Sequence, residues 1–145
     1  MSGIIASREA EIVEEFSLFD EWLDKYQHLI EMGQKLTGVD EAFRTDAYKV
    51  KGCQSQVWLQ PGIENGLVVF RADSDAAITK GLVALMVRVL SGAPAVEIVA
   101  SPLSFLEAIG LREHLSPTRS NGLVGMVKQM KLYAAAYASQ EASHG

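Results

Sequence analysis

The sequence has 145 residues and contains a single cysteine, Cys53, together with only three histidines. One cysteine excludes an intramolecular disulfide and any CxxC redox or zinc motif. A structural zinc site usually takes four Cys or His ligands, and an iron–sulfur cluster usually needs several thiolates. The histidines His28, His114 and His144 are widely separated, so we expect no metal site in this chain.

Clustered basic residues and long apolar runs are also missing. The net charge is −5, with no stripe of Lys and Arg, and this argues against nucleic acid as a partner because phosphates require a positive surface. The longest apolar run, Leu82–Val87, is too short to span a membrane. Residues 1–10 show no basic region followed by an apolar stretch, so we expect no signal peptide, no membrane attachment and a cytoplasmic location.

The remaining composition is that of a soluble globular protein, with 48% hydrophobic and 21% charged residues. The length fits one domain. We therefore predict a single domain over residues 1–145, with a flexible tail at residues 139–145.

Apolar residues at spacings of three and four predict helices in both halves of the chain. Asp20 is the expected N-cap of the second helix, and Ser74 or Asp75 is expected to cap the central one. The predicted helices span residues 9–16, 20–35, 75–90, 94–100, 104–109 and 121–138, with loops at 37–47 and 111–120.

Two short β-branched and aromatic runs predict strands between these helices. Val57–Leu59 precedes an expected turn at Pro61–Gly62, and Leu67–Phe70 follows the strong turn signal Asn65–Gly66. Tyr48–Val50 could extend the sheet. The order of elements predicts an α+β fold, in which helices pack on one face of a small antiparallel sheet.

The sequence around Cys53 is polar and flexible, although a lone cysteine is most often an inert, buried, small hydrophobic residue. Core cysteines usually have apolar neighbours, whereas here Gly52 permits a tight turn or the close approach of another chain. Lys49 and Lys51 lie nearby and could lower the pKa of the thiol. These features favour a reactive thiol on a loop.

Three kinds of chemistry are open to such a thiol. A hydrolase needs a histidine within hydrogen-bond reach, which His114 could supply, although no local signature indicates it. A redox sensor would form sulfenic acid and, without a second cysteine, would need a partner to recycle. Acceptance of sulfur from an enzyme persulfide needs only one thiolate, reach and docking on the donor, which matches the single Cys53.

Other residues also have both a structural and a functional interpretation. Asp73–Asp75 could be a functional acidic pair or a helix cap. Gly81 follows Lys80 inside a predicted helix, where glycine costs about 1 kcal/mol relative to alanine, so we expect close packing against the sheet or the Cys53 segment. Arg119 could bind an anion or a partner carboxylate, or could be a solvated or helix-capping side chain.

Three segments together resemble a known family. Gly52–Leu59, with the sequence GCQSQVWL, resembles the signature around the sulfur-accepting cysteine of the SufE family, which includes the CsdE branch. Asp73–Leu82 and Leu111–Gly122 resemble the next two family blocks in the same order. The resemblance covers about residues 8–138, which we take as the domain core. Three blocks in register are far more specific than one motif.

The resemblance implies a SufE/IscU-like fold, with Cys53 on a loop at one end of the molecule. It implies that Cys53 takes persulfide sulfur from a PLP-dependent cysteine desulfurase of the SufS or CsdA type and stimulates that enzyme. PLP belongs to the desulfurase, so this chain needs no cofactor. The residues expected to support the loop or the docking surface are Gly52, Gln54, Ser55, Asp75, Lys80 and Arg119.

The resemblance also implies that sulfur passes to an iron–sulfur scaffold such as SufBCD, and that the protein is a monomer or a weak homodimer. It leaves open whether the partner is of the SufS or the CsdA type. The alternatives are an activator that only docks on a desulfurase, and a single-cysteine thiol hydrolase or redox sensor.

Overall fold

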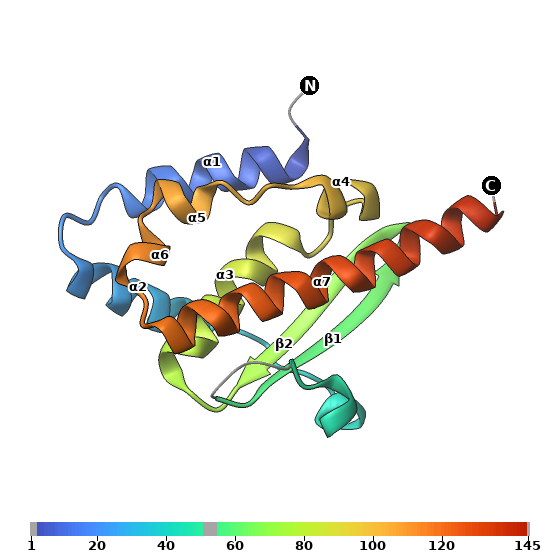
Figure 1. Ribbon diagram of the computed structural model, residues 1–145, viewed down its shortest axis with the longest axis horizontal. Helices are drawn as coiled ribbons and strands as arrows, with labels where there is room; N and C mark the ends of the chain where they lie inside the picture. Colours follow the sequence, from blue (N-terminus) through green and yellow to red (C-terminus); the bar gives the residue numbers. More distant parts are fainter. Residues whose placement is uncertain (1–2, 51–54, 145) are drawn as a thin grey trace.

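The computed structural model describes residues 3–50 and 55–144 (Figure 1). Two helices precede a β-hairpin, and further helices follow it, so the predicted α+β class is confirmed. The elements are α1 (Ile4–Phe16), α2 (Trp22–Gln34), the short 3-10 helices η1 (Glu41–Phe43) and η2 (Asp46–Tyr48), β1 (Val57–Glu64), β2 (Leu67–Ser74), α3 (Ala77–Leu90), α4 (Ala95–Ala100), α5 (Phe105–Ala108), α6 (Leu111–His114) and α7 (Pro117–His144).

The hairpin pairs β1 with β2 in antiparallel register, from Val57 opposite Ser74 to Glu64 opposite Leu67. Its turn is Asn65–Gly66, and both residues have positive φ, at 53° and 78°, as the Asn-Gly signal predicts. The predicted turn at Pro61–Gly62 is wrong, because β1 continues through both residues. Within the described chain, β1 has only β2 beside it at Pro61, and an edge strand tolerates a residue that lacks an N–H.

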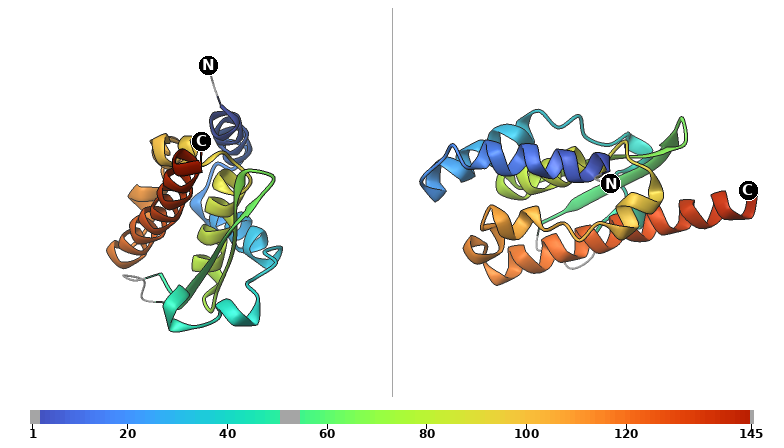
Figure 2. Two further views of the ribbon diagram at one scale, coloured as in Figure 1. Left: turned by 90° about the vertical axis from the view of Figure 1, so that its right-hand side faces the viewer. Right: turned by 90° about the horizontal axis from the view of Figure 1, so that it is seen from above.

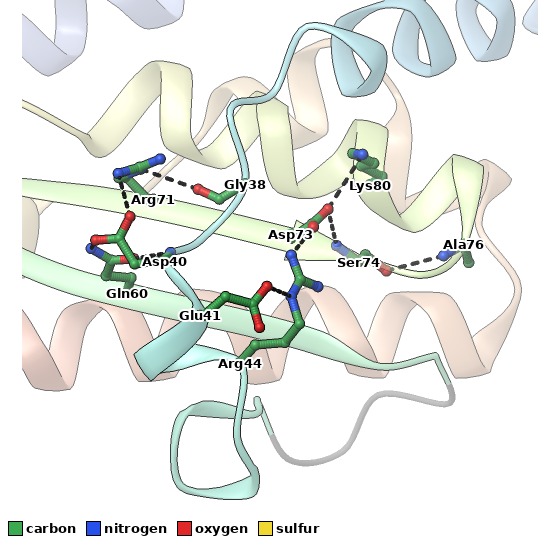
Figure 3. Close-up of polar contacts among 10 residues, drawn as sticks. All are labelled: Gly38, Asp40, Glu41, Arg44, Gln60, Arg71, Asp73, Ser74, Ala76 and Lys80. Carbon is green, nitrogen blue, oxygen red and sulfur yellow. Dashed lines mark hydrogen bonds and ion pairs between the residues drawn. The ribbon is translucent and has the colours of Figure 1, made fainter.

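The two faces of the hairpin differ in character. One face buries apolar side chains, namely Val57, Leu59, Val68, Phe70 and Ala72. Helix α3 packs against β2 and also contacts the long helix α7, and Figure 2 shows these elements from two further sides. The opposite, outer face carries the larger polar side chains and is crossed by the segment that leads from α2 to the hairpin (Figure 3).

Helices α2 and α3 approach each other very closely at two glycines. A Cβ atom added to Gly81 would lie 2.3 Å from the carbonyl oxygen of Leu29, and one on Gly33 would lie 2.8 Å from the backbone N of Gly81. Gly81 is therefore required by close packing, as the sequence predicts. Its nearest neighbours belong to α2, however, and not to the sheet.

The first three long helices begin at residues other than those predicted. Helix α1 starts at Ile4, earlier than expected, and the N-cap of α2 is Glu21 and not Asp20. Helix α3 starts at Ala77, after Ala76. Ser74 still contributes there, because its hydroxyl accepts a hydrogen bond from the backbone N–H of Ala76 at 3.3 Å.

The predicted loop at residues 111–120 is wrong, because it contains α6 and the first turn of α7. Ser116 is the N-cap of α7, since its hydroxyl accepts the backbone N–H of Arg119 at 3.2 Å. Pro117 occupies the first helical position, where its missing N–H is not needed. At the other end, α7 continues past Ala138 to His144. In the part of the chain that the structure describes, every helix is too short or too polar to cross a bilayer.

Candidate functional site

Cys53 and its neighbours Gly52 and Gln54 lie outside the described residues, so the site is defined here by the residues on either side of them. Lys49 pairs with Trp58 in an antiparallel bridge, and the backbone N–H of Val50 donates to the carbonyl oxygen of Val57 at 2.9 Å. The expected extension of the sheet by Tyr48–Val50 therefore exists as this short pairing. We name this pairing of residues 49–50 with residues 57–58 the strand bridge. It joins the chain on the two sides of residues 51–54, the Cys53 segment.

Asp75 holds the C-terminal side of that segment. Its Oδ1 accepts the backbone N–H of Gln56 at 3.0 Å, and its Oδ2 lies 3.4 Å from the Gln56 side-chain amide nitrogen. The backbone N–H of Asp75 donates in return to the carbonyl oxygen of Gln56 at 3.3 Å. These contacts attach the residue that precedes β1 to the connection between β2 and α3. They agree with the supporting role expected of Asp75, which stays a prediction.

A small cavity of about 70 Å³ lies beside Ser55, where the first turns of α3 and α7 meet. Ser55, Thr79, Thr118 and Arg119 give it polar walls, while Leu82, Gly122, Leu123 and Met126 contribute the rest of the lining. The volume is sufficient for a few water molecules. The structure thus brings together Ser55 and Arg119, two of the residues predicted from the sequence, on elements far apart in the chain.

Lys80 does not line this cavity, because it binds Asp73 on the hairpin, with 3.3 Å between Nζ and Oδ1. Arg44 donates to the other oxygen of Asp73 at 2.7 Å. Partial burial alone would raise the pKa of Asp73. Hydrogen bonds from Arg44, from the backbone of Ser74 and from Lys80 outweigh that effect and lower the pKa below 3.8. Arg44 was missed at the sequence level because nothing in its loop marks it.

The remaining sequence candidates have structural partners. The Nζ of Lys49 lies 3.0 Å from Asp46, a pair that is largely exposed on the Asp46 side. The imidazole of His114 stacks on the ring of Trp22, with 4.0 Å between the ring centroids. His114 therefore packs α6 against α2, and in the described part of the chain no histidine lines the cavity beside Ser55. Among the described residues, no three His, Cys, Asp or Glu side chains group in a way that could hold a metal ion.

Comparison with known proteins identifies the family. Residues 10–134 match the SufE family, described as an Fe-S metabolism associated domain. The chain belongs to the SufE family. It is 42% identical over 126 residues to an uncharacterized SufE-like protein of Rhizobium meliloti, a match that covers 83% of this chain and 90% of the relative. The three blocks recognised in the sequence fall within the matched range.

Two further relatives differ in length and in what their names say. SufE-like protein 1 of Arabidopsis thaliana, named as chloroplastic/mitochondrial, is 45% identical over 122 residues, which are 83% of this chain but only 33% of the plant protein. The sulfur acceptor protein CsdE of Escherichia coli is 37% identical over 110 residues, which are 74% of this chain and 75% of CsdE.

The fold itself recurs in a solved structure. A hypothetical protein of Thermus thermophilus, determined in solution, superposes with a TM-score of 0.78 over 96% of this chain and 99% of that protein, at 20% identity. At that identity the match establishes the fold alone. The shared fold extends over nearly the whole of both chains.

Proposed function

We propose that this SufE family protein accepts sulfur on Cys53 from the persulfide of a PLP-dependent cysteine desulfurase. The observation that carries the proposal is the 37% identity to the sulfur acceptor protein CsdE over most of both chains. Cys53 is the only thiol in the sequence, so a sulfur acceptor that uses a cysteine has no other residue to use.

The transfer needs no base or metal from this chain. The Cys53 thiolate attacks the terminal sulfur of the donor persulfide, and a new S–S bond forms as the donor's S–S bond breaks. The donor cysteine leaves as a thiolate, and Cys53 becomes a persulfide. The total oxidation state of the sulfurs is unchanged, so no oxidant or reductant is required. This simplicity suits a site in which the surrounding residues hold and present a thiol.

The partners follow from the same chemistry. The donor is a desulfurase of the SufS or CsdA type, which holds the PLP and is stimulated when its persulfide is emptied. The recipient is an iron–sulfur assembly scaffold such as SufBCD, and the proposed location is the cytoplasm. We propose that the protein works as a monomer or a weak homodimer. The Fe-S metabolism description of the family supports this destination for the sulfur.

A stimulation assay separates sulfur acceptance from docking alone. The rate of alanine release from free cysteine is measured for a purified SufS-type desulfurase of the same organism, with wild-type protein and with Cys53→Ser. The proposal predicts stimulation by the wild type and none by Cys53→Ser. Equal stimulation by both proteins would show that docking suffices. Turnover of a thioester or another substrate without a desulfurase would instead favour the hydrolase.

A further inference from the structure

The outer face of the hairpin presents two cross-strand pairs to the segment that precedes it. Trp58 lies opposite Asp73, and Gln60 lies opposite Arg71. Residues 38–48, which we name the strap, run from the end of α2 towards the Cys53 segment and cross the face of the hairpin that carries Gln60, Arg71 and Asp73 (Figure 3). Because side chains alternate along a strand, both pairs point to the same face and can bind the strap.

The first half of the strap is fixed by the Gln60–Arg71 pair, the one nearer the hairpin turn. Arg71 donates through Nε to the carbonyl oxygen of Gly38 at 3.1 Å and lies 3.0 Å from Asp40 through Nη1. The backbone N–H of Asp40 donates to Gln60 at 2.8 Å, and Gln60 donates back to the Asp40 carboxylate at 3.0 Å. This anchor holds the strap where it meets the middle of the strands.

The second half is fixed by Arg44, which contacts both members of the other pair. Its Nη2 donates to Asp73 at 2.7 Å, and its guanidinium carbon lies 4.8 Å from the centroid of the Trp58 ring. The Asp73 side chain is only 14% exposed. The indole N–H of Trp58 is buried and has no hydrogen-bond partner in the described chain. Among the described residues, the contact of Trp58 with Arg44 is therefore made through its ring and not through its indole N–H.

Trp58 is also part of the strand bridge, because it pairs with Lys49. A planar guanidinium can bind a carboxylate and stack on an aromatic ring at the same time, and Arg44 does both. If Arg44 is lost, Asp73 keeps its pairing with Lys80, but the Trp58 ring loses the nearer of two cationic contacts and keeps Lys49, whose Nζ lies 5.9 Å from the ring centroid. Loss of Arg44 should then weaken the strand bridge, which joins the chain on both sides of the Cys53 segment.

We propose that Arg44, acting through Asp73 and Trp58, is a positioning residue for sulfur transfer. Its contact with the Trp58 ring stabilises the strand bridge and so sets the geometry from which the thiol is presented. The inference rests on the proposed function of Cys53. It differs from a docking role, because Arg44 acts within this chain, and from a general stability role, because the contact affects one place in the fold.

The test compares Arg44→Gln with a matched variant of the other anchor, Asp40→Asn. Sulfur uptake from a purified SufS-type desulfurase and free cysteine is followed by mass spectrometry at several acceptor concentrations, at a temperature where both variants are fully folded. Arg44→Gln is expected to lower kcat about three- to tenfold with little change in KM, because misplacing a nucleophile slows the reaction step. Asp40→Asn is expected to keep the kcat of the wild type.

The outcomes separate the two levels of the argument. Unchanged kcat in Arg44→Gln, a rise in KM alone, or an equal loss of kcat in Asp40→Asn would overturn the positioning role. A wild type that takes up no sulfur from an active desulfurase would overturn the proposed function instead.

Hydrogen exchange then decides the inference independently of sulfur uptake. Arg44→Gln is expected to speed exchange of the Val50 amide about tenfold while leaving the Phe70 amide unchanged. Only the Val50 amide donates a hydrogen bond within the strand bridge. An unchanged Val50 amide would contradict the inference.

Discussion

The backbone N–H of Gln56 donates to Oδ1 of Asp75 at 3.0 Å, and the backbone N–H of Asp75 donates to the carbonyl oxygen of Gln56 at 3.3 Å. This reciprocal pair ties the end of the Cys53 segment to the residues that lead into α3. The strand bridge provides the corresponding attachment at Val50 and Val57. Contacts among the described residues therefore hold the chain on both sides of the segment.

Replacing Asp75 by alanine should loosen this attachment while leaving the fold intact. Asp75 and its partner Gln56 are both exposed, so the lost hydrogen bonds should lower the free energy of unfolding by only about 0.5–1.5 kcal/mol. Hydrogen exchange of the Gln56 amide should accelerate by more than the change in global stability explains. Asp24→Ala, at an exposed acid on α2, is the control. Equal exchange of Gln56 in both variants would contradict the assignment.

Replacing Gly81 by alanine should destabilise the protein, although alanine is the better helix former by about 1 kcal/mol. The added Cβ would lie 2.3 Å from the Leu29 carbonyl oxygen, so α2 and α3 would have to move apart. We expect a net loss of about 1–3 kcal/mol in urea unfolding. A neutral or stabilising result would show that the two helices are not in close contact there.

Acid should weaken the link between α1 and α3. Arg88 donates to the Glu15 carboxylate at 2.8 and 3.1 Å and lowers the pKa of Glu15 below 4.5; partial burial opposes this effect, and His28 reinforces it. A lowered carboxyl pKa adds stability that is present above the unfolded value and is lost as the pH falls through the folded value.

The free energy of unfolding of Glu15→Gln should therefore be lower than that of the wild type at pH 7, and the difference should shrink below about pH 4.5. Urea unfolding across this range measures it, with Glu14→Gln on the exposed side of α1 as the control. A difference that stays constant with pH would exclude the ion pair as its cause.

Ser116 should stabilise the long helix as its N-cap. Ser116→Ala removes the acceptor for the Arg119 backbone N–H and is expected to lower the free energy of unfolding by about 1 kcal/mol. Ser120→Ala, one turn further into α7, should have little effect. Similar values for the two variants would mean that the hydroxyl of Ser116 does not act as a cap.

Local signals in the sequence were sufficient for some elements and not for others. Asn65–Gly66 predicted the hairpin turn because the required backbone conformation is specific to such residues. The turn predicted at Pro61–Gly62 was wrong because the tolerance of an edge strand for proline depends on which strands lie beside it. The predicted start of the last helix at residue 121 is wrong, although Ser116–Pro117 is a local cap signal for a helix that begins at Pro117.

The residues of the candidate site were also predictable from the sequence only in part. The family resemblance singled out Cys53, and the structure brings Ser55 and Arg119 to one cavity. Arg44 could not be found from the sequence, because its partners, Asp73 and Trp58, become neighbours only when β1 pairs with β2 and the strap crosses them.

The most direct test of the central claim is the mass of the protein after incubation with an active SufS-type desulfurase and free cysteine, measured without reductant and mapped to peptides. The account predicts a gain of one or more sulfur atoms on the peptide that contains Cys53, reversed by dithiothreitol and absent in Cys53→Ser. An unchanged Cys53 peptide, with a desulfurase that is shown to turn over, would contradict it.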